Sequence, residues 1–194
     1  MMAKIAYPDL AEAPKELADL LAAMPRVAPI DMLAHSPLIA QCFLRLAQAQ
    51  FTTLQLPERA RELVILTVAA AGRCEYEYRQ HVLISEVAGV EPELRESIWE
   101  GTIDPATLPV AERALVLFVA DVLRAPRVSA ERLTQLQSHY SPRQIVEILH
   151  LIGFYWGFGR ICTVLDIEIE TPTNLDAMMA VSNFDRDDAP TQSP

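Results

Sequence analysis

Four side chains that can exchange protons lie close together in the sequence. Glu62, Cys74, Glu77 and His81 follow one another at intervals of twelve, three and four residues. At 3.6 residues per turn, the last three share one face of a predicted helix, and Glu77 and His81 are i,i+4 neighbours. A carboxylate one turn from an imidazole can orient the ring and share a proton with it. The spacing suits general acid–base catalysis, with a solvated ion pair as the alternative.

Glu62 and Cys74 each allow a functional and a structural interpretation. Glu62 precedes the apolar segment Val64–Val68, where burial without a partner would raise its pKa and suit it to proton donation. A salt bridge to Arg59 or another arginine is the alternative. Cys74 lies beside Arg73 at a helix start, where the helix dipole and the cation both favour a reactive thiolate. An inert packing cysteine is the competing interpretation.

Three further residues are candidates for binding a substrate. Arg73 and Arg79 could hold an anionic group, although each also suits a surface position. Tyr76 and Tyr78 lie on different sides of the helix, and one hydroxyl could reach the pocket while the other ring packs. The spacing does not decide between them, and Tyr78 is taken as the candidate beside the two arginines. No pattern in the sequence predicts a metal site or a bound cofactor.

The elements that position these residues are predicted to be helices. Apolar residues recur every three or four positions, and alternating runs of β-branched residues are scarce. We therefore predict an all-α fold, with one domain over residues 1–170 and a mobile tail over residues 171–194. The predicted helices cover residues 14–23, 37–50, 57–71, 74–88, 92–100, 109–123 and 130–139, and a last long helix begins at residue 142. Gly72 is the expected stop of the third.

Two helix starts are similar, and the last helix is strongly apolar. Residues 57–62 and 142–147 both pair a first-turn proline with a glutamate five residues later. This indicates either a duplicated helical hairpin or ordinary helix-start chemistry repeated. In the last helix, His150 suits a hydrogen-bonded position in the core. Three glycines among aromatic residues predict close helix packing rather than a cofactor site: Gly153, Gly157 and Gly159.

Charge, hydropathy and cysteine content limit the partners that we expect. A net charge of -10 disfavours nucleic acid. The N-terminus has no basic leader joined to an apolar core, and charged residues interrupt the most apolar stretch, residues 145–167. We therefore expect a cytoplasmic protein without a membrane partner. Cys42, Cys74 and Cys162 have neither paired nor metal-ligand spacing, which favours reduced thiols over a disulfide framework or zinc cluster.

Several blocks of this sequence resemble the carboxymuconolactone decarboxylase family, which includes the alkyl hydroperoxidase D branch. The most specific block reads Cys-Glu-Tyr-Glu-Tyr over residues 74–78 and is followed by His81. The other matching blocks are residues 32–37, 56–63, 72–81, 88–89 and 152–155, with Arg160. The resemblance implies an all-helical fold without a cofactor, and a homo-oligomer such as a trimer or hexamer with pockets near subunit contacts.

One position departs from the hydroperoxidase branch that the sequence resembles. The signature of that branch is a glutamate, two cysteines and a histidine, and these positions fall on Glu62, Cys74, Glu77 and His81. The second cysteine of that branch attacks the peroxide, and here it is replaced by Glu77. Cys74 keeps only the resolving position. A Cys-X-X-Cys disulfide cannot form, because a glutamate side chain cannot replace a thiol in exchange chemistry.

Three functions remain open from the sequence. The leading hypothesis is a cofactor-independent lyase or isomerase that acts on a small carboxylated or carbonyl substrate by decarboxylation, isomerisation or opening of a lactone-like ring. His81 would be its base, Glu77 its orienting or proton-sharing partner, and Glu62 an acid beyond it. The alternative is a thiol-dependent peroxidase or reductase that uses Cys74 with an external thiol. The third is a non-catalytic oligomeric binding protein, which predicts a solvated Glu77.

Overall fold

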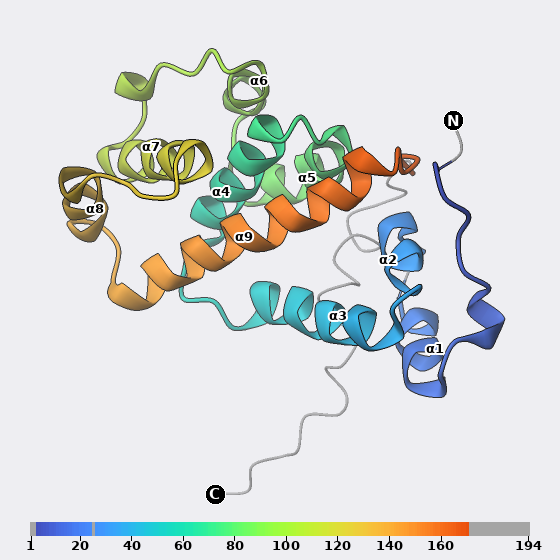
Figure 1. Cartoon of the computed structure of the whole chain (residues 1–194). Helices are drawn as coiled ribbons and strands as arrows, with labels where there is room; N and C mark the ends of the chain where they lie inside the picture. Colours follow the sequence, from blue (N-terminus) through green and yellow to red (C-terminus); the bar gives the residue numbers. More distant parts are fainter. Residues whose placement is uncertain (1–2, 25, 171–194) are drawn as a thin grey trace, which may run out of the picture. The chain divides into compact units, whose positions relative to one another are not determined.

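The computed structural model describes residues 3–24 and 26–170, and every regular element in these ranges is a helix. The predicted all-α fold is confirmed. The helices are α1 Lys15–Ala22, α2 Ala28–Leu33, α3 Pro37–Thr52, α4 Glu58–Ala71, α5 Glu75–Val87, α6 Pro92–Glu100, α7 Val110–Arg124, α8 Ala130–Gln137 and α9 Pro142–Val164 (Figure 1). The sequence did not predict three short elements, because segments of three to six residues are too short to show a helical hydrophobic period. They are the 3-10 turns Leu10–Glu12 and Pro105–Thr107 and the helix α2. The tail predicted over residues 171–194 lies outside the described residues.

The helices group into two compact units. Of the described residues, one unit consists of residues 5–24, 26–53 and 169–170 and contains α1, α2 and α3. Within it, α1 and α2 pack against α3, and the buried Asp31 accepts a hydrogen bond from Nε of Arg26 at 2.6 Å. The other consists of residues 3–4 and Leu54–Glu168 and contains α4 to α9, with all four candidate catalytic residues. The sequence predicted a single domain over residues 1–170, and this remains a prediction.

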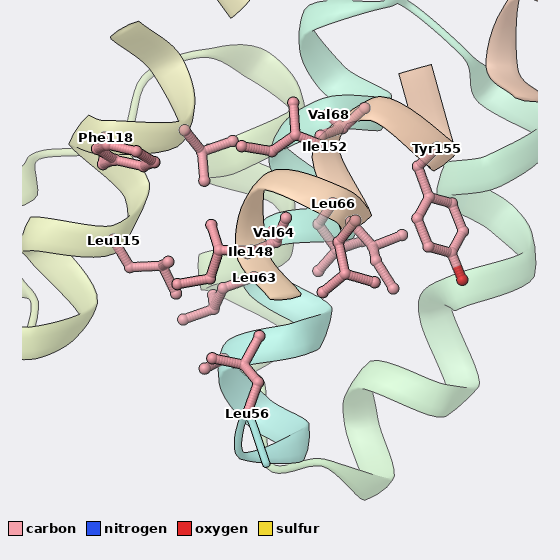
Figure 2. Close-up of a cluster of buried hydrophobic side chains, with 14 of the residues drawn as sticks. Leu56, Leu63, Val64, Leu66, Val68, Leu115, Phe118, Ile148, Ile152 and Tyr155 are labelled. Atoms are coloured by element: carbon pink, nitrogen blue, oxygen red, sulfur yellow. The ribbon is translucent and has the colours of Figure 1, made fainter. Parts of the chain in front are cut away.

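α4 is the central helix of the larger unit. It packs against α5, α6, α7 and α9 (Figure 1), and all its residues from Ala60 to Ala69 are buried. A helix covered on every side must be apolar on nearly every side. The hydrophobic core that α4 forms with α7 and α9 includes the following residues (Figure 2): Leu63, Val64, Leu66, Leu115, Phe118, Ile148, Ile152 and Tyr155. A carboxylate in such a helix, as at Glu62, needs polar partners within the unit.

α4 ends and α5 begins within a few residues, through a left-handed cap. Arg73 has a φ of 49°. The Cys74 N–H donates to the Ala69 carbonyl at 2.9 Å, and the Arg73 N–H donates to the Ala70 carbonyl at 3.1 Å. This pair of bonds is the Schellman arrangement. Gly72 is the C-cap residue of α4, as predicted; its φ is -80°, and the left-handed position falls on Arg73.

Fewer glycines than the sequence predicted lie in close contact with a neighbouring helix. A Cβ on Gly72 would lie 2.7 Å from the guanidinium of Arg160, which donates a hydrogen bond to the Gly72 carbonyl. A Cβ on Gly159 of α9 would lie 3.4 Å from the Cβ of Cys74. The prediction of close packing is wrong for the two other glycines of α9, where an added Cβ would meet nothing within 4 Å: Gly153 and Gly157.

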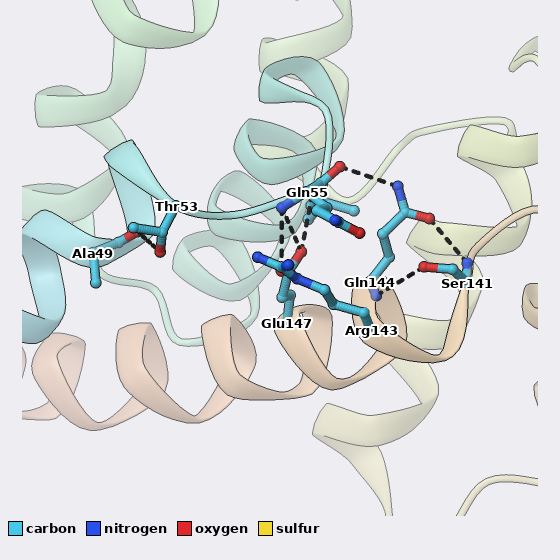
Figure 3. Close-up of polar contacts among 8 residues, drawn as sticks. Ala49, Thr53, Gln55, Ser141, Arg143, Gln144 and Glu147 are labelled. Carbon is cyan, nitrogen blue, oxygen red and sulfur yellow. Dashed lines mark hydrogen bonds and ion pairs between the residues drawn. The ribbon is translucent and has the colours of Figure 1, made fainter. Parts of the chain in front are cut away.

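α9 begins with a capping box and holds the segment that leads into α4. The Ser141 hydroxyl accepts from the Gln144 N–H, and the Gln144 side chain accepts from the Ser141 N–H (Figure 3). Glu147 accepts hydrogen bonds from the backbone N–H groups of Gln55 and Leu56, at distances from 2.9 to 3.1 Å. Glu147 therefore caps the backbone entering α4. A duplicated hairpin, which this helix start indicated, stays a prediction.

Among the described helices, α9 alone is long and apolar enough to cross a membrane by length and composition. Half of the apolar window is buried inside the protein, and α9 packs against α4, α5 and α8. Its Glu147 and Arg160 bind neighbouring backbone groups. These contacts are those of a core helix.

Candidate functional site

Glu62 of α4 and His81 of α5 meet inside the larger unit. Oε2 of Glu62 lies 2.7 Å from Nδ1 of His81, and Oε1 accepts a hydrogen bond from Nε of Arg61 at 2.9 Å. Glu62 is 0% exposed and His81 is 5% exposed. Burial opposes ionisation of Glu62, but His81 and Arg61 outweigh burial and lower the pKa of Glu62. An ionised Glu62 fixes the ring, with Nδ1 as the donor and Nε2 turned toward Glu77.

Glu77 lies at the other nitrogen of the imidazole. Its Oε2 is 3.7 Å from Nε2 of His81, which is longer than a hydrogen bond. Glu77 is 3% exposed, and this burial raises its pKa well above the ordinary value; the charges of Cys74 and Glu62 raise it further. Glu77 therefore keeps its proton to a higher pH than a solvated glutamate. A carboxyl group in this state can act as a proton donor.

The structure exchanges the roles predicted for the two carboxyl groups. We expected Glu77 to orient His81 and Glu62 to remain protonated. Instead Glu62 makes the short contact and has the lowered pKa, while Glu77 has the raised pKa. The i,i+4 spacing placed Glu77 near the ring, but the packing of α4 on α5 determines the stronger partner. The salt bridge considered for Glu62 is formed with Arg61, not with Arg59.

Cys74 is the N-cap residue of α5 and is 2% exposed. The pKa of its thiol is lowered to about 7, chiefly by a hydrogen bond from the side chain of Cys162. Burial opposes this shift, while two backbone N–H groups of the first turn of α5 and the charge of Arg160 support it. The helix start thus acts as expected, but the cation comes from α9 and is not Arg73. The thiol of Cys74 is therefore more acidic than that of a solvated cysteine.

The three candidate substrate-binding residues contact other side chains. Arg73 donates to the Trp99 carbonyl at 3.0 Å, and its guanidinium carbon lies 5.8 Å from the centre of the Trp99 ring. Tyr78 packs on the same ring, with the ring centres 4.7 Å apart. Arg79 forms an exposed ion pair with Glu75 at 2.5 Å. None of these contacts is with Glu62, Glu77 or His81, and a role in substrate binding stays a prediction.

Three residues of α9 that were not predicted as site residues also lie at the site. Tyr155 of α9, expected only as aromatic filling, lies edge-on to His81 with the ring centres 5.3 Å apart. Burial, with the charges of Glu77 and Glu62, raises the pKa of its hydroxyl. No spacing in the sequence links α9 to α5, so the contributions of this helix were not predictable: Tyr155, Arg160 and Cys162.

Solved structures place this fold among known proteins. The peroxidase-related protein from Ralstonia eutropha JMP134, described as having an alkylhydroperoxidase AhpD core, superposes with a TM-score of 0.73 at 18% identity, covering 94% of this chain and 97% of that one. A peroxidase-related protein from Silicibacter sp. TM1040 gives 0.71 at 18% identity, covering 87% and 92%. A cysteine-to-alanine variant of the debrominase Bmp8, in complex with 2,3,4-tribromopyrrole, gives 0.68 at 18% identity, covering 92% and 95%. The fold is therefore that of the AhpD-like helical proteins.

The family assignment comes from the sequence around the site. Residues 37–115 match the carboxymuconolactone decarboxylase family, and this segment contains Glu62, Cys74, Glu77 and His81. This match agrees with the resemblance to the carboxymuconolactone decarboxylase family that the sequence indicated. No curated protein is significantly similar in sequence.

Proposed function

We propose that this protein is a cofactor-independent acid–base enzyme, a lyase or isomerase that acts on a small carboxylated or carbonyl compound. The observation that carries the proposal is the row Glu62, His81, Glu77, in which one imidazole lies between two buried carboxyl groups. The two carboxyl groups have pKa values shifted in opposite directions. Neighbouring groups with separated pKa values are the usual sign of an assigned acid and base.

The row suits the removal and return of a proton beside a carbonyl group. Glu62, ionised, accepts from Nδ1 of His81 and supports the positive charge that the ring gains when Nε2 takes a proton. Glu77, protonated, can donate to the oxygen or carbon on which negative charge develops. The near absence of solvent around both side chains strengthens these interactions, because the local dielectric constant is low.

A proton-exchange assay tests this proposal before the natural substrate and product are identified. The protein is incubated in D₂O with a panel of lactones, keto acids and carboxylated lactones, and deuterium at the carbon beside the carbonyl is followed by NMR. His81→Ala should lower the rate for any active compound by about 100-fold or more. Glu77→Gln should also slow exchange, because it removes the donor.

The matched control is His139→Ala, which removes an exposed histidine of the same unit and should leave the rate unchanged. Unfolding temperatures of all variants separate lost catalysis from lost folding. An active compound that His81→Ala turns over at the wild-type rate would remove His81 from the mechanism.

A second candidate function, thiol-dependent peroxidase or reductase activity at Cys74, is favoured by its low thiol pKa. Two of the similar structures are described as peroxidase-related, and a third is a debrominase. Hydrogen peroxide, an alkyl hydroperoxide and 2,3,4-tribromopyrrole, each with an external thiol, are therefore the compounds to assay. Loss of turnover in Cys74→Ser but not in Cys42→Ser supports this candidate; equal turnover in both rejects it.

The third alternative, a non-catalytic binding protein, predicted a solvated Glu77, and the 3% exposure of Glu77 favours an enzyme over it. For the assembly we propose a homo-oligomer in the cytoplasm, without nucleic acid or membrane partners. The resemblance to the family supports the oligomer, and the net charge of -10 disfavours nucleic acid. Light scattering coupled to size exclusion would give the subunit number from a chain of 21.6 kDa.

A further inference from the structure

α5 and α9 bring two cysteines together that are far apart in the sequence. The Cys162 side chain forms a hydrogen bond with Cys74. Both are free thiols, 3% and 2% exposed. Gly159, one turn before Cys162 on α9, makes the approach possible, because a Cβ there would lie 3.5 Å from Sγ of Cys74. The contact between the thiols is therefore built into the packing of the two helices.

We propose that Cys74 and Cys162 form a reversible redox pair, which reduces a hydroperoxide and closes to a disulfide between α5 and α9. This pair would replace the Cys-X-X-Cys pair that Glu77 removes. The proposal rests on the thiol-dependent candidate function and extends it by naming the second thiol. Its test does not require turnover by the acid–base row.

The positions of the two cysteines on their helices assign their roles. Cys74 is at the N-terminal end of α5, where backbone N–H groups point toward the sulfur and stabilise negative charge. Arg160 adds a positive charge nearby. Cys162 lies in the last turn of α9, where the negative end of the helix dipole opposes a thiolate. Cys74 is therefore the attacking thiolate, and Cys162 is the thiol that resolves its oxidised form.

The chemistry takes two steps. The Cys74 thiolate attacks the terminal oxygen of a hydroperoxide; an S–O bond forms, the O–O bond breaks, and the departing alkoxide takes a proton from water. Cys74 is then a sulfenic acid, oxidised by two electrons. The Cys162 sulfur attacks Cys74; an S–S bond forms, the S–O bond breaks, and water leaves with the proton of the Cys162 thiol. Two equivalents of an external thiol reduce the disulfide and restore both groups.

Peptide mapping of the full chain tests the pair. The protein is treated with substoichiometric hydrogen peroxide, free thiols are blocked under denaturing conditions, and a non-reducing digest is analysed by mass spectrometry. The expected product is a peptide cross-linked through Cys74 and Cys162. Cys42→Ser should leave its yield unchanged. In Cys162→Ser the cross-link should vanish, and the sulfenic acid at Cys74, trapped with dimedone, should increase several-fold over wild type.

Two results would overturn the pair. One is oxidation of wild-type Cys74 without the cross-link to Cys162, and the other is equal trapping of sulfenic acid in wild type and Cys162→Ser. The wild-type measurement alone decides the first, so a variant that folds poorly cannot obscure it. The cross-link is detected without any carbonyl substrate, and its absence would leave the acid–base proposal unaffected. Failure of the deuterium exchange assay would likewise leave the cross-link unaffected.

Discussion

Glu62 and Glu77 are chemically identical and both buried, yet their pKa values move in opposite directions. Glu62 accepts hydrogen bonds from His81 and Arg61, and these partners favour its charged form. At Glu77, burial and two negative neighbours all disfavour the charged form and raise the pKa. The neighbours, and not the residue type, therefore separate the pKa values of the two glutamates. This separation is what a proton relay through His81 requires.

Cys74 provides a prediction at the same scale. The ultraviolet absorbance of its thiolate, taken as the difference between wild type and Cys74→Ser, should titrate with a midpoint of about 7. Cys162→Ala should raise this midpoint, because it removes the largest stabilising contact, and Arg160→Gln should raise it less. The control is Arg73→Gln, since the side chain of Arg73 binds at Trp99. A midpoint that Arg73→Gln raises as much as Cys162→Ala does would contradict this assignment.

The junction of α4 and α5 decides where the site residues lie at the scale of the element. The Schellman cap turns the chain sharply after α4, so α5 begins with Cys74 at its N-terminal end. From that start, Glu77 and His81 both reach the face of α5 that lies on α4. The turn requires one residue with a positive φ, and the sequence supplies Arg73 there.

Glycine at position 73 should give a more stable protein than alanine at the same position. A side chain with a Cβ in the left-handed region costs about 1 kcal/mol relative to glycine. Arg73→Gly and Arg73→Ala both lose the contacts with Trp99, so their difference isolates the backbone term. We expect Arg73→Gly to have the larger free energy of unfolding by about 1 kcal/mol in urea denaturation. Equal free energies of unfolding for the two variants would show that the left-handed conformation at position 73 carries no energetic cost.

At the scale of the whole larger unit, the buried carboxyl group of Glu77 reduces the stability of the fold. Burial of an ionisable group is unfavourable unless partners compensate it, and the raised pKa of Glu77 indicates incomplete compensation. In the unfolded chain a glutamate titrates near its ordinary pKa. The folded state therefore binds more protons than the unfolded state above that pKa, and its stability falls as the pH rises toward the folded pKa.

Glu77→Gln should therefore stabilise the protein at pH 8, and this gain should shrink as the pH falls toward 4. Glu62→Gln is the matched comparison with the opposite sign. Its lowered pKa stabilises the folded state above the unfolded pKa, and this contribution disappears as the pH falls through the folded pKa. Glu62→Gln should thus destabilise at pH 8. Unfolding temperatures of both variants across this pH range measure the two trends; a stability gain for Glu77→Gln that does not depend on pH would refute the linkage.

The helices and the site segment were predictable because their signals are local. Hydrophobic periodicity gave eight of the α-helices with nearly their observed bounds, and the spacing of Cys74, Glu77 and His81 placed them on one helix. Glu62 was included because it lies twelve residues before Cys74 in a segment apolar enough to be buried. The short helix α2 and the left-handed residue Arg73 were missed, because six residues show no period and an arginine gives no sign of a positive φ.

The sequence by itself determined the all-helical fold, the match of residues 37–115 to the carboxymuconolactone decarboxylase family and the absence of a Cys-X-X-Cys pair, since each depends on residue types at short, fixed spacing. Only the tertiary structure decided which carboxyl group is ionised, which cation lies near Cys74 and which thiol faces it. Those properties depend on burial and on contacts between α4, α5 and α9. A pKa is set by the groups within a few ångströms, and helix packing brings those groups together from distant parts of the chain.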